Sequence, residues 1–430
     1  MAEIEKIETD SKRRITYYYH GEVGNFHYGP RHPMKPQRLA ACTNLVVNYE
    51  IDKEMEMREA NRVGKWEMER FHTPEYIKFL ENISPHNAEQ FENRFVDFCI
   101  GDDCPVFQGI FDFCSLYSGA SLEGAVLLNN QASDIVINWS GGLHHAKKSE
   151  ASGFCYVNDI VLAILELLKH YKRVLYIDID IHHGDGVQEA FEFTDRVMTV
   201  SFHKYGDHFF PGTGNMYDIG HDHGRLFSVN VPFTQGIQDE GYLSVFKPVI
   251  QHVMDCFQPE AIVLQCGADS LGGDRLGNFN LSFDGHGDCV RFVRDFNVPL
   301  LVLGGGGYTL RNVARCWANE TGILCGKRLK DDIPDTAEYM KFFEPEFTLR
   351  PTLEKRHEDQ NTKEFLNSIR EYVCENLRRV QGAPSVQMQP IPIDAFEKEE
   401  VLKKEEPDVD MHVDNSNDHL NTTYNGTATA

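Results

Sequence analysis

The segment from Val174 to Gly186 combines apolar residues with carboxylates and imidazoles at a regular spacing. Asp178, Asp180 and His182 alternate with isoleucine, and a period of two places three ionisable groups on one face of a β-strand. Carboxylates on a buried strand are costly unless they are paired or bind a metal ion. A salt-bridged core is the alternative, but no lysine stands near the end of this strand. The pattern therefore favours a metal site.

A further carboxylate, Asp269, follows a second apolar run and Gln265-Cys-Gly-Ala. Active sites of open α/β sheets gather at the carboxyl ends of the strands, so this side chain can join the first segment. Asp180, His182 and Asp269 then supply three ligands and leave one position open for water and substrate. Oxygen ligands with one imidazole suit a catalytic Zn²⁺ or Fe²⁺, whereas a structural zinc site is closed and usually rich in thiolates.

Two adjacent imidazoles, His144 and His145, follow Ser140-Gly-Gly at the end of another apolar run. Such a pair is suited to proton transfer, although a lone pair of histidines is more often structural. Asp178 and Asp185 flank the metal segment and can hold the Nδ1–H groups of the two rings. A carboxylate in that position orients an imidazole and makes it more basic.

Tyr308 follows the four glycines Gly304 to Gly307. A phosphate-binding loop is the alternative, but no Lys-Ser/Thr follows these glycines and the G-x-x-x-x-G-K pattern is missing. We expect instead a glycine-rich loop that delivers one phenol, whose hydroxyl donates a hydrogen bond to a developing oxyanion.

The elements that position these groups are indicated by continuous apolar runs, which are typical of parallel strands buried on both faces. The stretch Asn158–Tyr171 has apolar residues at helical spacing, with Asn158 or Asp159 as its N-cap. Strand, helix and strand in succession predict an α/β fold with a central parallel β-sheet flanked by helices. The predicted strands are Asp134–Trp139, Arg173–Ile181, Arg196–Phe202, Ala261–Leu264 and Pro299–Leu303.

Composition restricts the classes of function. The 430 residues carry 42 Lys and Arg against 66 Asp and Glu, a net charge of −24, which argues against direct DNA binding and favours a lysine-rich substrate. No apolar stretch is long enough to span a membrane. The residues up to Arg14 lack the apolar core of a secretory signal, and the 11 cysteines form no C-x-x-C pair, so we expect reduced thiols inside the cell.

Seven motifs in order along the chain resemble those of the class I zinc-dependent histone deacetylases. They are Asn25-Phe-His-Tyr-Gly with His32-Pro-Met-Lys-Pro, Gly141-Gly-Leu-His-His-Ala, Gly153-Phe-Cys-Tyr-Val-Asn-Asp, Asp178-Ile-Asp-Ile-His-His-Gly-Asp-Gly, Phe209-Phe-Pro-Gly-Thr-Gly, Gln265-Cys-Gly-Ala-Asp-Ser and Gly304-Gly-Gly-Gly-Tyr. The resemblance implies a single large domain with an arginase/deacetylase-like fold. It also implies zinc-dependent hydrolysis of the acetyl amide of acetyl-lysine on histone tails, in the nucleus and also in the cytoplasm.

The resemblance assigns roles residue by residue. Tyr308 would donate to the oxyanion, His144 would pair with Asp178, and His145 with Asp185. His145 is the preferred base, but which imidazole is base and which is acid stays open. The residues expected to bind zinc are Asp180, His182 and Asp269. The residues expected to grip the lysine stem in a narrow tube are Gly153, Phe154, Phe210 and Leu276, with Asp103 holding the substrate backbone at the rim.

Further ions and a partner also follow from the resemblance. One structural K⁺ or Na⁺ site would involve Asp178, Asp180, His182, Ser201 and Phe202, and a second Phe191, Thr194, Val197 and Phe227. Inositol phosphate, an activator held where a corepressor protein docks, would contact His27, Arg31, Lys35, Arg275 and Arg311. Relatives tend to have glycine at the position of Arg31, and scattered surface bases are the plain alternative.

The resemblance also suggests the domain boundaries. The residues divide into an N-terminal extension (1–13), a deacetylase catalytic domain (14–384) and a tail (385–430). An apolar stripe from Phe365 to Val380 predicts a last helix that ends near Gln381. From Asp394 to Asp418 there are ten acidic residues and three lysines, which predicts a disordered acidic tail.

Three other functions remain open. An arginase-like hydrolase would need extra carboxylates for two metals, and the positions between the ligands, Ile179 and Ile181, are apolar. A deacetylase of polyamines or other small molecules would use the same chemistry, although Asp103 and the basic residues favour a protein substrate. A largely non-catalytic corepressor scaffold is disfavoured because the expected ligands and Tyr308 are present.

Overall fold

The computed structural model describes residues 5–6 and 13–380 of the chain. Eight strands form one sheet in the order β3-β2-β4-β9-β8-β5-β6-β7, and every neighbouring pair is parallel. These strands are β2 (Ile15–Tyr18), β3 (Glu56–Arg58), β4 (Ile135–Asn138), β5 (Val174–Asp178), β6 (Val197–Lys204), β7 (Ser228–Phe233), β8 (Ala261–Gln265) and β9 (Leu300–Leu303). A separate antiparallel pair joins β1 (Glu5–Lys6) to β10 (Lys327–Arg328).

Helices cover both faces of this sheet because its strands are apolar on both sides. Leu175 and Ile177 of β5 pack into one core, and Val174 and Tyr176 pack into the other. Helices of the first core are α1 (Gln37–Asn48), α7 (Asp239–Phe257), α8 (Phe283–Arg294) and α9 (Leu310–Leu324), with α10 (Lys363–Leu377) against α7. Helices of the second core are α4 (Ile110–Asn129), α5 (Asp159–Leu167) and α6 (Asp185–Phe191).

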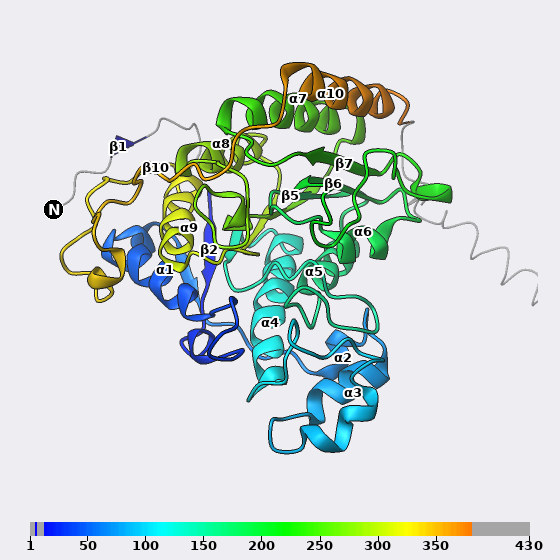
Figure 1. The fold of residues 1–430 in the computed structure, drawn as a ribbon, viewed down its shortest axis with the longest axis vertical. Helices are drawn as coiled ribbons and strands as arrows, with labels where there is room; N and C mark the ends of the chain where they lie inside the picture. Colours follow the sequence, from blue (N-terminus) through cyan, green and yellow to red (C-terminus); the bar gives the residue numbers. More distant parts are fainter. Residues whose placement is uncertain (1–4, 7–12, 381–430) are drawn as a thin grey trace, which may run out of the picture. The chain divides into compact units, whose positions relative to one another are not determined.

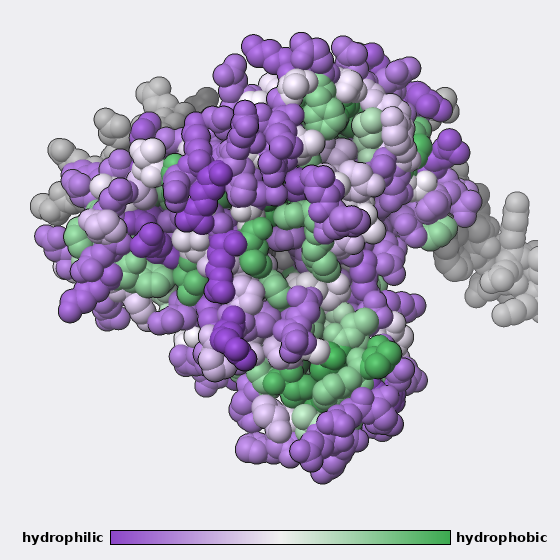
Figure 2. Space-filling model, in the orientation of Figure 1, coloured by the Kyte–Doolittle hydropathy of each residue, from purple (hydrophilic) through white to green (hydrophobic). Residues whose placement is uncertain are grey.

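Shorter helices complete the described chain. The α-helices α2 (Lys65–Met68) and α3 (Pro74–Asn82) lie together beyond one end of α4 (Figure 1). Hydrophilic side chains cover most of the face shown in Figure 2, and an apolar area lies over α2 and α3. The short 3-10 helices are Val23–Asn25, Ile51–Glu54, Ala88–Arg94, Asp222–Gly224, Ala268–Ser270 and Met340–Phe343.

The predicted parallel sheet and its buried strands are confirmed, with one correction that concerns the site. β5 ends at Asp178, so Asp180 and His182 do not lie on a strand face as the alternation predicted. The backbone N–H of Asp180 donates to Asp178 Oδ1 (3.0 Å), and that of His182 donates to Asp180 Oδ1 (2.9 Å). These local turns replace the strand ladder, because an aspartate side chain can bond the backbone two residues ahead.

Helix boundaries agree with the sequence in part. Asn158 is the N-cap of α5, and its side chain accepts a hydrogen bond from the N–H of Val161. The helix ends at Leu167 rather than Tyr171, and α10 ends at Leu377. The last helix therefore ends four residues before the predicted Gln381. The tail boundary at 384/385 and the acidic tail lie outside the described residues, as does most of the extension 1–13.

Two expectations from composition can be compared with the structure. All 11 cysteines lie in the described part, and all are free thiols, eight of them buried. Among the described helices, none is both long and apolar enough to cross a membrane.

Candidate active site

Four neighbouring strands of the sheet bring the predicted groups together. In space the order is β4, β9, β8, β5, and the carboxyl ends of parallel strands meet at one edge. The loop after β4 carries His144 and His145, the glycine loop after β9 carries Tyr308, and the short 3-10 helix after β8 carries Asp269. Side chains as far apart in the sequence as His144 and Tyr308, which are separated by 164 positions, therefore lie at the same edge of the sheet.

The three expected metal ligands form one buried cluster. His182 Nδ1 lies 3.0 Å from Asp180 Oδ1 and 3.1 Å from Asp269 Oδ2. Asp180 Oδ2 also accepts hydrogen bonds from Gln265 Nε2 (3.0 Å) and from the N–H of Gly306 (2.8 Å). One donor atom from each of the three residues fits within 4.8 Å of the others, the arrangement expected of ligands to one ion.

The electrostatics of this cluster fit a divalent cation. Among the residues that the structure describes, no lysine or arginine pairs with Asp180 or Asp269. Burial and the neighbouring charge of Asp180 raise the pKa of Asp269 far above its usual range. His144 Nε2 also lies 3.8 Å from Asp180 Oδ2, so two imidazoles face these buried carboxylates. A bound metal ion would add the charge that favours the ionised form of Asp269.

Each of the two adjacent imidazoles has its own carboxylate. His144 Nδ1 lies 2.7 Å from Asp178 Oδ2, and His145 Nδ1 lies 2.8 Å from Asp185 Oδ1. Because a carboxylate accepts, both Nδ1 atoms donate, and the Nε2 atoms are left for other partners. The two rings are 3.9 Å apart between centroids.

Two partners of these carboxylates were not predicted. Tyr176 Oη donates to Asp178 Oδ2 (2.5 Å), and Lys147 Nζ lies 2.8 Å from Asp185 Oδ2. Tyr176 stands two residues before Asp178 on the same strand, so the period of two could have indicated it. Lys147 is two residues past His145, in a loop whose course the sequence pattern does not define.

The environment separates the pKa values of the two imidazoles. Burial opposes the charged form of His144, but the charges of Asp178 and Asp180 prevail and raise its pKa to about 9. Burial and the neighbouring charge of His144 lower the pKa of His145 to about 3, despite its bond to Asp185. The surroundings therefore favour the charged form of His144 and the neutral form of His145, a division typical of acid and base groups.

Tyr308 is held at the end of the glycine loop with only 6% of its surface exposed. Arg38 of α1 donates to the carbonyl oxygens of Gly305 (2.5 Å) and Gly307 (2.6 Å), which fixes the loop on the side of that helix. Burial and the charges of Asp269 and Asp180 raise the pKa of Tyr308 well above its ordinary value. The phenol therefore stays protonated and can donate a hydrogen bond.

The residues predicted to contact substrate lie on the outer side of this centre. A Cβ atom at Gly153 would come within 2.4 Å of the His145 ring, so glycine lets the chain pass close to it. The Phe210 ring lies 4.9 Å from that of His145, and the Phe154 ring 5.6 Å from that of Tyr308. Phe210 and Leu276 are 41% and 39% exposed, and Asp103 is exposed too.

Comparison with known proteins decides the family. Residues 32–324 match the histone deacetylase domain, a span that includes every residue of the centre described above. The chain belongs to the histone deacetylase family. It is 55% identical over 405 residues to histone deacetylase B of Dictyostelium discoideum, covering 93% of this chain and 96% of the relative.

Two further relatives agree. Histone deacetylase 9 of Arabidopsis thaliana is 53% identical over 400 residues, which cover 93% of each chain. Type-1 histone deacetylase 1 of Dictyostelium discoideum is 53% identical over 399 residues, 93% of this chain and 80% of the relative. The predicted resemblance to class I histone deacetylases is confirmed, and so are the arginase/deacetylase-like fold and the assignment as a hydrolase.

The residues predicted to bind monovalent cations form two groups in this histone deacetylase. Asp178 and Ser201 are partners in the β5–β6 register, next to Phe202, and Asp180 and His182 follow on the loop after β5. The second group lies between the end of α6 and the start of β7. It consists of Phe191, Thr194, Val197 and Phe227. The assignment of both groups to cations stays a prediction.

The five predicted inositol phosphate contacts stand on three segments of the deacetylase. Lys35 Nζ donates to the carbonyl oxygens of Gly29 (2.6 Å) and Pro30 (3.1 Å), and Arg311 donates to that of Glu344 (3.1 Å). Among the described residues, none of the four lysine and arginine side chains of this set forms an ion pair with a carboxylate, so their positive charge is available to an anion. The five are His27, Arg31, Lys35, Arg275 and Arg311.

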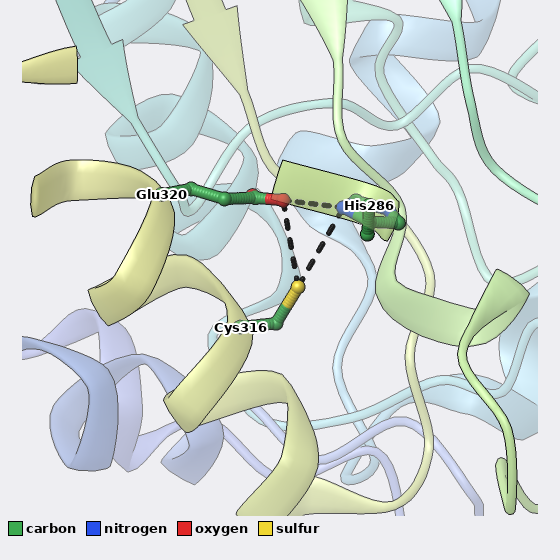
Figure 3. Close-up of side chains that lie close together, drawn as sticks. All are labelled: His286, Cys316 and Glu320. Atoms are coloured by element: carbon green, nitrogen blue, oxygen red, sulfur yellow. Dashed lines mark hydrogen bonds and ion pairs between the residues drawn. The ribbon is translucent and has the colours of Figure 1, made fainter. Parts of the chain in front are cut away.

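A second buried cluster, which the sequence did not predict, joins α8 to α9 (Figure 3). His286 Nδ1 is hydrogen-bonded to Glu320 Oε1, and Cys316 Sγ lies 3.6 and 3.5 Å from these two atoms. The other ring nitrogen, Nε2, donates to the carbonyl oxygen of Gly267 (3.0 Å), two residues before Asp269. Despite burial, the charge of Glu320 raises the pKa of His286, so both ring nitrogens donate.

Stability measurements can test whether His286 and Glu320 form a buried ion pair. Glu320→Leu should lower the free energy of unfolding by about 3–5 kcal/mol, because it leaves a buried imidazole without its counter-charge. The double variant His286→Leu/Glu320→Leu should be about as stable as the unmodified protein, since apolar side chains of similar volume replace both charges. Denaturant unfolding followed by circular dichroism measures both. A double variant as unstable as the single one would contradict the ion pair.

Proposed function

We propose that this histone deacetylase uses zinc, held by Asp180, His182 and Asp269, to hydrolyse the acetyl amide of acetyl-lysine on histone tails and other proteins. The observation that carries the proposal is the convergence of a buried carboxylate–imidazole cluster, two oriented imidazoles and one protonated phenol at the ends of adjacent strands. Fe²⁺ suits the same donor set and is the alternative metal.

The chain's own residues supply proton transfer and charge stabilisation. When bound, zinc would act as a Lewis acid on the acetyl carbonyl and lower the pKa of a water molecule towards about 7. His145, the neutral ring, accepts the proton of the attacking water, and Asp185 holds it in the required tautomer. Tyr308 donates its phenolic proton as a hydrogen bond to the developing oxyanion. His144, the charged ring, orients the water and takes part in proton delivery to the leaving lysine amine.

Substrate selection follows from the outer residues. Gly153, Phe154, Phe210 and Leu276 present an apolar wall to the four-carbon stem of lysine. The carboxylate of Asp103 receives backbone N–H groups of the peptide at the rim, which distinguishes a protein substrate from a polyamine. The proposed catalytic domain is residues 14–384, with 1–13 as an extension and 385–430 as an acidic tail.

A partner and accessory ions complete the proposal. The unpaired basic residues bind inositol phosphate at the docking site of a corepressor protein, which places the enzyme on chromatin in the nucleus. K⁺ or Na⁺ at the two groups near β5 and α6 supports the metal-binding loop. The net charge of −24 argues against direct DNA binding as the means of recruitment.

Release of acetate from defined substrates tests the proposal. An acetylated histone peptide should be hydrolysed in a metal-dependent reaction, and acetylspermidine should be a much poorer substrate. Adding a corepressor domain with inositol phosphate should raise the rate on the peptide. Preference for the polyamine would replace the protein substrate, and no hydrolysis in any arm would support the scaffold alternative.

A further inference from the structure

Asp274 lies on the loop between β8 and α8, and its carboxylate receives four backbone N–H groups. Oδ1 accepts from Leu276 (2.9 Å) and Gly277 (3.0 Å), and Oδ2 accepts from Tyr308 (2.8 Å) and Thr309 (3.1 Å). The side chain is buried, with 4% exposed. An ionised carboxylate has about four lone-pair sites, so this one is fully used.

The two carboxylate oxygens of Asp274 accept hydrogen bonds from different segments of the chain. The hydrogen bonds that Oδ1 accepts close a local turn. Aspartate, asparagine and, more weakly, serine all form such turns with the backbone two residues ahead. The hydrogen bonds that Oδ2 accepts come from a different segment, 34 residues further along the chain, which contains the proposed oxyanion donor Tyr308. A third crossing bond runs from Thr309 Oγ1 to the carbonyl oxygen of Gly273 (2.9 Å).

The peptide group before Tyr308 is therefore held from both sides. Its carbonyl oxygen, on Gly307, accepts from Arg38 (2.6 Å), and its N–H donates to Asp274 (2.8 Å). Rotation of this peptide plane would break both bonds. A fixed peptide plane restricts the direction of the Cα–Cβ bond of Tyr308. Gly307 alone would not restrict it, because glycine leaves the backbone free to rotate.

We propose that Asp274 is a positioning residue for deacetylation: it fixes the Tyr308 phenol relative to Leu276 at the entrance. The inference rests on the proposed roles of Tyr308 and Leu276. The proposal explains why a carboxylate stands at position 274. Asparagine could form the local turn, but its NH₂ group would then face the N–H groups of Tyr308 and Thr309, which need an acceptor.

Two variants separate the crossing bonds from the local turn. Asp274→Asn and Asp274→Ser both keep an acceptor for Leu276 and Gly277, whereas neither accepts from Tyr308. We expect kcat on an acetylated peptide to fall roughly 10–100-fold, since a shift of about 1 Å in a catalytic group can cost 10²-fold. KM should change less than threefold, and metal content should stay at the wild-type level.

The matched control is Asp239→Asn. Asp239 likewise accepts from a backbone N–H and a hydroxyl, those of Ser282 (2.8 and 2.6 Å), but it lies at the start of α7 and contacts neither Leu276 nor Tyr308. Its kcat should stay within twofold of wild type. Normal kcat in both Asp274 variants would overturn the proposal, and so would loss of metal or of the melting transition in both, because Asp274 would then be structural.

A double-mutant cycle shows whether Asp274 acts through the phenol. In a Tyr308→Phe background, Asp274→Asn should lower kcat less than threefold further, because the group it positions is gone. The same fold loss in both backgrounds would overturn the positioning role. Full turnover of Tyr308→Phe alone would instead remove Tyr308 from the mechanism, which is a failure of the proposed function.

Discussion

Replacement of Asp269 by alanine should remove both the bound metal and the deacetylase activity. Asp269 supplies one of three ligand side chains, and losing a ligand costs far more than the ~10–100-fold lost on changing an outer partner. Elemental analysis of purified protein should fall from one divalent ion per chain to a trace. Peptide hydrolysis should fall below detection, and Asp180→Ala should behave in the same way.

The control for this experiment is Asp255→Ala, on the exposed side of α7, where the carboxylate contacts only Gln251 among described residues. That variant should keep its metal and its activity. Two ions per chain in the unmodified protein would favour the arginase-like alternative, and a fully active Asp269→Ala enzyme would contradict the proposed ligand set.

Tyr308→Phe should lower kcat by roughly 10²–10³-fold, the loss typical of one oxyanion donor. Metal content and melting temperature should not change, because the ring keeps its packing against Phe154 and the backbone keeps its bond to Asp274. Single-turnover kinetics at saturating peptide measure the chemical step. Tyr171→Phe, which removes a hydroxyl bonded to the Leu128 carbonyl far from the site, is the matched control. Turnover near the wild-type value would exclude the phenol from the reaction.

The sequence predicts this fold well where a signal is local. Continuous apolar runs predict β4, β5, β6, β8 and β9, and the Asn158 cap predicts the start of α5. The predicted end of β5 is wrong because Ile179 and Ile181 continue the apolar pattern beyond Asp178, where the strand ends. Asp178 and Asp180 bond the backbone two residues ahead and turn the chain, and no pattern of hydrophobicity records that competition.

Several of the residues that the sequence did not indicate contact partners far away along the chain. Arg38 reaches Gly305 and Gly307, and His286 reaches Glu320, across 267, 269 and 34 positions. A buried arginine or histidine in an unremarkable helix carries no spacing signal of its own. The candidate site residues, by contrast, stand at strand ends next to glycine, where residue type and position together indicate chemistry.

The strand order has a consequence for how the molecule is made. β9 pairs with β4 on one side and β8 on the other, although both precede it in the chain. Before β9 is made, the sheet itself can therefore form only as two separate parts, β3-β2-β4 and β8-β5-β6-β7. The loop with His144 and His145 follows the first part, and the second part carries the proposed metal ligands. Until β9 has left the ribosome, the sheet lacks the strand that joins its two parts, so the proposed site can be completed only after residue 303 of the 430 has been synthesised.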